Sequence, residues 1–358
     1  MTGKRWLLWL AGLIAVLALA TVAAGCGGDD EEAADEEPPA ATGATGTEPE
    51  AEPIRVGLVT DIGGLDDKSF NMLANQGLER ARDELGVEIR VLQSSSDADY
   101  VPNLSSLAEE GYNLIISVGF LMGEVTEQVA KEFPDVNFAI IDFAYEAPPE
   151  NLQGIVFKEQ ETGYLVGYLA GLVTQSDLDR TNEQNVVSSV GGQKIPPVDR
   201  FIAGFQAGAK AANEGVETPN AYSQDFVAQD KCKEVALDQI TNGSDVVFQV
   251  AGGCGLGALD AANERDVWGI GVDADQSHLG EHILTSAMKR VDNAVFDTIK
   301  MVQDGAFAGG GVSVFGLAED GVGLGEVSDE VPQELQDQLD EQRQMIIDGE
   351  IEIPETVE

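Results

Sequence analysis

Basic side chains are scarce in this chain. Its 358 residues include 20 Lys and Arg against 64 Asp and Glu, which gives a formal net charge of −44 at pH 7. A surface of this sign repels the phosphates of nucleic acids and the headgroups of anionic lipids. We therefore expect neither a nucleic-acid-binding protein nor a basic membrane-binding patch. Multiply anionic ligands are disfavoured as well, unless a local basic pocket compensates.

Histidine is rarer still, and the two that are present do not form a recognisable metal site. His278 and His282 are four residues apart, but the His-Glu-x-x-His order of zinc proteases is absent and Gly280 lies between them. We therefore predict no metal and no cofactor. No serine or cysteine has an evident catalytic base either, so we expect that the protein is not an enzyme.

Cysteine occurs three times, and Cys26 marks an export signal. Two basic residues near the N terminus precede an uncharged run over 6–24, and small residues at 23–25 lead into the cysteine. That is the layout of a secretory signal. It resembles the bacterial lipobox, in which the thiol is lipidated and the preceding residues are removed, although Ala23 stands where Leu, Val or Ile is usual. An uncleaved membrane anchor is the alternative, because about 20 apolar residues can span a bilayer.

An acidic segment follows the cysteine. Ten acidic and no basic residues lie between Asp29 and Glu52, among Ala, Gly, Thr and Pro. Such a segment cannot bury enough apolar surface to fold, so we predict a signal peptide over 1–25 and a disordered, self-repelling tether over 26–53. The rest of the chain retains 54 acidic and 18 basic residues, a net charge of −36, so most of the acidity belongs to the folded part.

Short apolar runs alternate with longer amphipathic segments in the rest of the chain, without a short-period repeat. We predict a helix over 70–85, a helix over 164–173 that opens a second lobe, and strands over 54–59, 87–92, 114–118, 138–141, 186–190, 246–250 and 267–272. Repeated strand–helix–strand units imply parallel sheets covered by helices on both faces. About 300 residues exceed what one core usually serves, so we predict a two-lobed α/β protein.

Ligands of open parallel sheets bind at the carboxyl ends of the strands. The first such loop reads DIGGLDDKSFN over 61–71. Its glycines allow a tight backbone path, and Ser69 is suited to cap the following helix, whose free N–H groups would point into the cleft. Phe70 and Asn71 place a flat apolar face beside an amide. A plain strand-to-helix turn with Phe70 in the core is the alternative.

The loop after the strand 246–250 allows a different function. Gly253, Gly255 and Ala258 fit a relaxed dinucleotide-binding fingerprint, and Asp273 follows about 20 residues later, where a ribose-binding acid is expected. This pattern would indicate an oxidoreductase. The export signal opposes it, because nicotinamide cofactors are not supplied outside the cell.

Two cysteines remain for the folded part, Cys232 and Cys254. In an exported protein a pair is usually bonded, and both positions lie near adjacent strand-to-helix turns. We predict a disulfide that braces the wall of the proposed pocket. Two buried free thiols are the alternative.

Four segments together, in this order, resemble the basic membrane protein family. They are DIGGLDDKSFN at 61–71, VVFQVAGGCGLGALDAA at 246–262, WGIGVDADQ at 268–276 and ILTSAMKR at 283–290. This family comprises substrate-binding lipoproteins of ATP-driven importers related to the purine nucleoside receptor, and the likeness covers roughly residues 54–310. It implies a periplasmic-binding-protein type I fold, with residues 54–157 and 275–312 in the first lobe and 158–274 and 313–358 in the second.

The resemblance also implies a ligand site. Phe70 and Phe226 match the aromatic residues that sandwich the base, and Asp142 matches an acid at the base edge. Asp273 matches the acid that grips the ribose hydroxyls, with Lys289 near it. Asp61 and Asn71 match the polar groups of the family's first loop, and Ser69 lies beside them. Gly252 and Gly253 match the place where the backbone approaches the ligand.

Each of these residues also has an ordinary structural explanation. Phe226 would be a core aromatic, Asp142 a turn former, Asp273 a cap and Lys289 a solvated helix charge. With the resemblance, we expect a lipid-anchored, extracytoplasmic, monomeric protein that captures a small neutral ligand, a purine nucleoside, for an ABC permease. A surface receptor or signalling protein of the same fold is the alternative.

Overall fold

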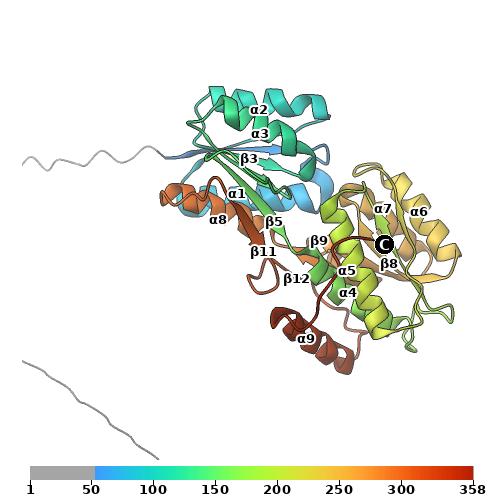
Figure 1. Ribbon diagram of the computed structural model, residues 1–358. Coiled ribbons are helices and arrows are strands. Elements are labelled where there is room, and N and C mark those ends of the chain that lie inside the picture. Colours follow the sequence, from blue (N-terminus) through green and yellow to red (C-terminus); the bar gives the residue numbers. More distant parts are fainter. Residues whose placement is uncertain (1–52, 358) are drawn as a thin grey trace, which may run out of the picture. The chain divides into compact units, whose positions relative to one another are not determined.

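The computed structural model describes residues 53–357 (Figure 1). The signal peptide, Cys26 and nearly all of the predicted tether lie outside the described residues. None of the helices in the described part is long and apolar enough to cross a membrane. This part forms two lobes, each built on a six-stranded sheet.

The first sheet is parallel throughout, with the strand order β11-β5-β4-β3-β1-β2. Its strands are β1 (Arg55–Thr60), β2 (Glu88–Leu92), β3 (Leu114–Val118), β4 (Asn137–Ile141), β5 (Leu152–Phe157) and β11 (Val312–Phe315). The helices α1 (Phe70–Leu85) and α8 (Val291–Gln303) cover one face, and α2 (Tyr100–Glu109) and α3 (Gly123–Glu132) cover the other (Figure 1). Because both faces are covered, β3 is apolar and buried at nearly every position.

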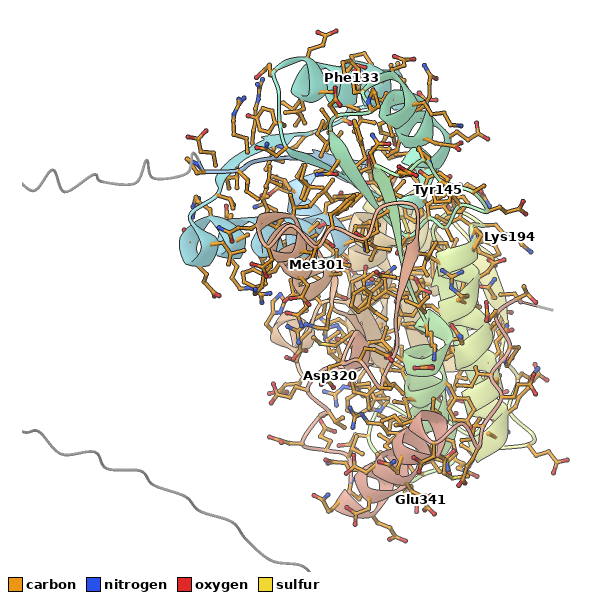
Figure 2. The ribbon with its side chains drawn as sticks, turned by 60° about the vertical axis from the view of Figure 1, so that its left-hand side comes forward. Phe133, Tyr145, Lys194, Met301, Asp320 and Glu341 are labelled. Atoms are coloured by element: carbon orange, nitrogen blue, oxygen red, sulfur yellow. A yellow bond between two sulfur atoms is a disulfide. The ribbon has the colours of Figure 1, made fainter. Side chains whose placement is uncertain are left out.

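The second sheet has the order β12-β10-β9-β8-β6-β7, in which only β12 runs antiparallel. Its strands are β6 (Val186–Gly191), β7 (Asn220–Tyr222), β8 (Ser244–Val250), β9 (Trp268–Asp273), β10 (Ile283–Lys289) and β12 (Val322–Leu324). One face carries α4 (Glu159–Val173) and α5 (Pro196–Ala212), and the other carries α6 (Gln229–Thr241) and α7 (Gly252–Glu264). A last helix, α9 (Gln333–Ile347), packs against α4. In both lobes side chains fill the space between sheet and helices (Figure 2).

The predicted two-lobed α/β fold with mainly parallel sheets is confirmed, but part of the predicted lobe division is wrong. Strand β10, which the sequence places in the first lobe, pairs with β9 in the second sheet. Strand β11, most of which the sequence places in the second lobe, pairs with β5 in the first. The cause is that no α-helix separates β9 from β10 or β4 from β5. A strand–helix–strand pattern therefore does not reveal β5 and β10. The chain crosses to the other lobe after β5, after β10 and once more between β11 and β12.

Glycines bring two helices of the second lobe into close contact. Each helix places glycines against the backbone of the other, Gly163, Gly167 and Gly171 in α4 and Gly204 and Gly208 in α5. A Cβ at Gly208 would meet the backbone carbonyl of Tyr164, and a Cβ at Gly167 would meet that of Phe205. Neither obstacle is a flexible side chain that can turn away, so the helices pack backbone to backbone.

We predict that Gly208→Ala destabilises the protein by about 1–3 kcal/mol, because overpacking against a backbone forces the two helices apart. Helix propensity alone would favour alanine by about 1 kcal/mol, so a loss must come from packing. Gly323→Ala is the matched control, since a Cβ there meets nothing within 4 Å. Urea unfolding measures both, and equal stability of the two variants would contradict the prediction.

Candidate ligand-binding site

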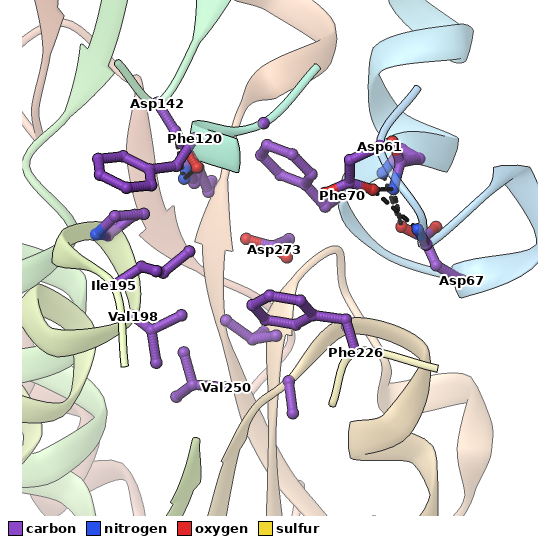
Figure 3. Close-up of a pocket in the computed structure, with 18 of the residues that line it drawn as sticks. Asp61, Asp67, Phe70, Phe120, Asp142, Ile195, Val198, Phe226, Val250 and Asp273 are labelled. Atoms are coloured by element: carbon purple, nitrogen blue, oxygen red, sulfur yellow. Dashed lines mark hydrogen bonds and ion pairs between the residues drawn. The ribbon is translucent and has the colours of Figure 1, made fainter. Parts of the chain in front are cut away.

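A pocket lies between the two lobes, at the carboxyl ends of the central strands (Figure 3). Nine of the ten residues predicted from the sequence line it, namely Asp61, Phe70, Asn71, Asp142, Phe226, Gly252, Gly253, Asp273 and Lys289. Ser69 is the exception: it is completely buried and does not line the pocket. The pocket thus brings together side chains that are more than 200 residues apart in the chain.

Sequence reasoning missed most of the apolar lining. Gly119, Phe120 and Leu121 follow β3, Val250 ends β8, Ala251 follows it, and Val272 precedes Asp273 in β9. Ile195, Pro197, Val198 and Phe201 come from the start of α5, and Gly63 and Asp67 belong to the first loop. The residues at the ends of β3, β8 and β9 could have been predicted, because each lies at the carboxyl end of a predicted strand.

Asp67 organises the first loop. Its carboxylate accepts hydrogen bonds from the backbone N–H groups of Ser69 (3.1 Å), Asn71 (2.7 Å) and Met72 (3.1 Å), and from the Asn71 side chain (3.1 Å). The expectation that Ser69 caps α1 is therefore wrong, since Asp67 occupies the N–H groups that the serine would bind. The same bonds mean that these N–H groups are not free to face the cleft.

Asn71 lines the pocket and has one side-chain acceptor without a partner in the described part of the chain. Its Nδ2 donates to Asp61 (2.9 Å) and Asp67, while its Oδ1 is buried without a protein partner among the described residues. Asp61 accepts a second bond from the backbone N–H of Gly63 (2.9 Å). Burial raises the pKa of Asp61 to about 6, and the bonds from Gly63 and Asn71 oppose this increase. A buried acceptor without a donor costs free energy, so the site is suited to a ligand that donates at Asn71.

The charge of Lys289 is engaged by two carboxylates. Lys289 ends β10 with 1% of its surface exposed, so it is not a solvated helix charge. Its Nζ lies 2.6 and 2.7 Å from the two oxygens of Asp142 and 2.9 Å from Glu159, whose other oxygen accepts from Arg200 (2.6 Å). Burial alone would lower the pKa of Lys289, but Asp142, Glu159 and Asp273 outweigh it and raise the pKa. Lys289 therefore stays charged without being free to neutralise a phosphate.

Asp142 and Asp273 occupy equivalent places in the two lobes. Strands β4 and β9 have the same position in the two sheet orders, Asp142 directly follows β4, and Asp273 ends β9. Both residues adopt a left-handed backbone, with φ of 73° and 61°. Burial raises the pKa of Asp273 to about 7, opposed by Lys289 and by a hydrogen bond from Ser69. Non-glycine residues in this conformation are strained, and such strain is concentrated at functional sites.

Two aromatic rings face the pocket from different lobes. Phe70 begins α1 in the first lobe, and Phe226 precedes α6 in the second. In Figure 3 Asp273 lies between them. The Lys289 ammonium is 5.0 Å from the centroid of the Phe70 ring. The two rings thus form opposing apolar walls, with polar acceptors between and beside them.

A disulfide braces the wall that carries Phe226. Cys232 in α6 and Cys254 in α7 are bonded, with a Cα–Cα distance of 5.6 Å. The backbone N–H of Cys254 also donates to the carbonyl of Phe226 (3.0 Å). In the chain-entropy model, closing a loop of this size contributes about 3 kcal/mol. Gly252 and Gly253 are the first two residues of α7, where backbone N–H groups have no acceptor within the helix.

Of the glycines that suggest a dinucleotide fingerprint, Gly253 lines the pocket and Gly255 serves packing, since a Cβ there would meet the Gln249 side chain. The two histidines lie apart from the pocket: His278 is exposed in a 3-10 turn, while His282 is buried. No cluster of potential metal ligands occurs between residues 53 and 357.

The buried carboxyl of Asp273 predicts a pH-dependent stability. Its pKa of about 7 in the fold exceeds the ordinary value of 3.8, so the stability it contributes at low pH is lost as the pH rises toward 7. Relative to Asp273→Asn, the wild type should lose on the order of 3 kcal/mol of unfolding free energy between pH 5 and pH 8. Urea unfolding at both pH values measures this, with Asp329→Asn as an exposed control. A constant difference between wild type and Asp273→Asn would contradict it.

Comparisons with known proteins agree with this architecture. Residues 54–357 match a family model described as "ABC transporter substrate-binding protein PnrA-like". The chain is 38% identical to a "CD4+ T-cell-stimulating antigen" of Listeria innocua, over 87% of this chain and 91% of that protein. It is 32% identical to the "ABC transporter nucleoside-binding protein BmpA" of Lactococcus lactis, over 87% and 92%.

A solved structure shares the fold as well. The solute-binding protein of an ABC transporter system from Aeropyrum pernix superposes with a TM-score of 0.79 at 30% identity, over 86% of this chain and 94% of that one. The family match covers both lobes and every strand described above. The chain therefore belongs to the Bmp family of PnrA-like ABC transporter substrate-binding proteins.

Proposed function

We propose that this substrate-binding protein captures a purine nucleoside outside the cytoplasmic membrane and presents it, as a monomer, to an ABC importer. The observation that carries the proposal is the donor and acceptor balance of the pocket. Asn71 offers an unpartnered oxygen, Asp61, Asp142 and Asp273 offer carboxylates, and the only cation of the described lining, Lys289, is already engaged. Such a pocket needs a ligand that is rich in donors and carries no negative charge.

A purine nucleoside meets these requirements. Its base is flat and stacks on aromatic faces such as those of Phe70 and Phe226, and its edge carries N–H donors for Asn71 or Asp142. Its vicinal hydroxyls suit one carboxylate that accepts two charge-assisted hydrogen bonds, the role we assign to Asp273. A nucleotide would bring its phosphate toward several carboxylates, so we expect it to be rejected. The printed name of the Lactococcus lactis relative, a nucleoside-binding protein, agrees with this assignment.

The two-lobed architecture determines how the protein changes conformation when a ligand binds. A ligand between Phe70 and Phe226 contacts both lobes, so its binding free energy favours their closed arrangement. A permease that recognises the closed arrangement would then accept only loaded protein. The binding role needs neither a cofactor nor a catalytic residue.

We further propose that Cys26 is lipidated and that the acidic segment to residue 53 tethers the folded part to the membrane. Replacing Cys26 by serine should then release the protein from the membrane fraction into the soluble extracytoplasmic fraction. Fractionation and mass spectrometry of the N terminus test this. Continued membrane association of Cys26→Ser with an intact N terminus would instead indicate an uncleaved anchor.

Calorimetry and thermal shift test the ligand assignment. The chain from residue 53 onward suits these measurements, because it contains both six-stranded sheets and every lining residue of the pocket between them. We expect nucleosides to raise the melting temperature, and free bases, nucleotides and sugars to have little effect. A shift with a sugar or vitamin and with no nucleoside would overturn the ligand claim while leaving the family intact.

Two substitutions test the proposed roles within the pocket. Phe70→Ala removes one stacking wall and Asp273→Ala removes the carboxylate, so each should weaken nucleoside binding at least tenfold without unfolding the protein. Phe133→Ala, on the α3 side of the first lobe and away from the pocket, is a control for the loss of a ring. Normal binding by both pocket variants would refute the site assignment.

A further inference from the structure

A hydrogen bond joins the two lobes beneath the pocket. Ser69 lies between η1 (Leu65–Asp67) and α1 in the first lobe, and none of its surface is exposed. Its hydroxyl lies 2.7 Å from Oδ2 of Asp273 and 3.2 Å from the carbonyl oxygen of Val272, both in the second lobe. The hydroxyl has one proton to donate. The carboxylate oxygen of Asp273 is the closer and the stronger of the two acceptors, so it receives the hydrogen bond.

The local structure of the first loop leaves this hydroxyl free to cross between the lobes. A serine at the start of a helix usually binds the N–H groups of the first turn. Here the carboxylate of Asp67 takes those of Asn71 and Met72. The same loop also meets the second lobe at Gly253, where a Cβ would lie 3.6 Å from Cα of Asp67. The two lobes therefore approach each other at Asp67 as well as at the serine.

We infer that Ser69 is a positioning residue: from the first lobe it holds one oxygen of Asp273, so that the other oxygen is aimed at the ligand only when the lobes are closed. The inference rests on the proposed role of Asp273 in binding ligand hydroxyls. It makes lobe closure and ligand capture depend on one shared carboxylate. Opening the lobes breaks the bond and leaves Asp273, with its left-handed backbone, free to turn.

The charged groups around Asp273 determine how the bond acts on its ionisation. Lys289 faces it from β10, and the carboxylates of Asp142 and Asp67 face it from the first lobe. The two acids favour the protonated form of Asp273, while Lys289 and the Ser69 hydroxyl favour the ionised form. Loss of the hydroxyl alone should therefore move the titration of Asp273 to higher pH.

The test compares Ser69→Ala with the wild type by adenosine calorimetry across pH 5 to 9. We expect the dissociation constant of Ser69→Ala to rise about tenfold at pH 7.5, and the pH at which binding is half lost to move upward by a measurable amount. Ser69→Thr keeps the hydroxyl and should remain close to the wild type. Ser188→Ala is the matched control, since its buried hydroxyl bonds to Ser244 (2.7 Å) within the second lobe.

A second measurement does not depend on any ligand. Carboxyl carbon NMR, with the Asp273 signal assigned by its loss in Asp273→Asn, should show a higher pKa for Asp273 in Ser69→Ala than in the wild type. If the wild type binds no nucleoside, the proposed function fails, and this titration still decides the role of Ser69. An unchanged Asp273 titration in Ser69→Ala would overturn the inference, as would a loss of affinity in Ser69→Thr or Ser188→Ala as large as in Ser69→Ala.

Discussion

The buried ion pair of Lys289 with Asp142 and Glu159 is the contact on which the rest of the site depends. The side chains of Lys289, Asp142 and Glu159 are 2%, 7% and 0% exposed, and the lysine stands where β10 ends and the chain crosses back to the first lobe. Glu159 begins α4, just after the chain's first crossing. Removing one partner of a buried pair leaves an uncompensated charge, at a cost of about 3–5 kcal/mol. The cluster therefore links the first two of the three crossings, and Asp142 and Lys289 place it in the wall of the pocket.

The paired lysine determines which charge and which hydrogen-bonding groups a ligand of the pocket must have. Because the lysine is already paired, the groups left for a ligand are the carboxylates of the pocket and the unpartnered oxygen of Asn71. The ligand must therefore donate hydrogen bonds, and anionic ligands are disfavoured. The equivalent aspartates at the ends of β4 and β9 bring one acceptor from each lobe. Phe70 and Phe226 likewise bring one apolar ring from each lobe. A ligand that satisfies all of these groups must contact both lobes, which is what couples binding to closure in the proposed function.

Much of the fold follows from periodicity, and two of its failures have a common cause. The helix over 70–85 and the strand over 114–118 agree with α1 and β3 to the residue. Strands β5 and β10 went unrecognised because short turns, not helices, precede them. Residues at the carboxyl ends of strands could be placed near the pocket from the sequence. The capping by Asp67 could not, because it depends on the exact backbone path of the first loop. The contact of Ser69 with Asp273 and the pairing of Lys289 with Glu159 could not either, because they depend on side-chain directions between residues far apart in the chain.

The central claim is that a nucleoside base lies between Phe70 and Phe226 with its ribose hydroxyls on Asp273. A crystal structure of the protein with its tightest-binding nucleoside tests this most directly. We predict planar density between the two rings, the ribose hydroxyls within hydrogen-bond distance of Asp273, and a base-edge donor on Asn71 or Asp142. Density for a sugar or another non-planar ligand between the rings, or a nucleoside bound outside them, would contradict the account.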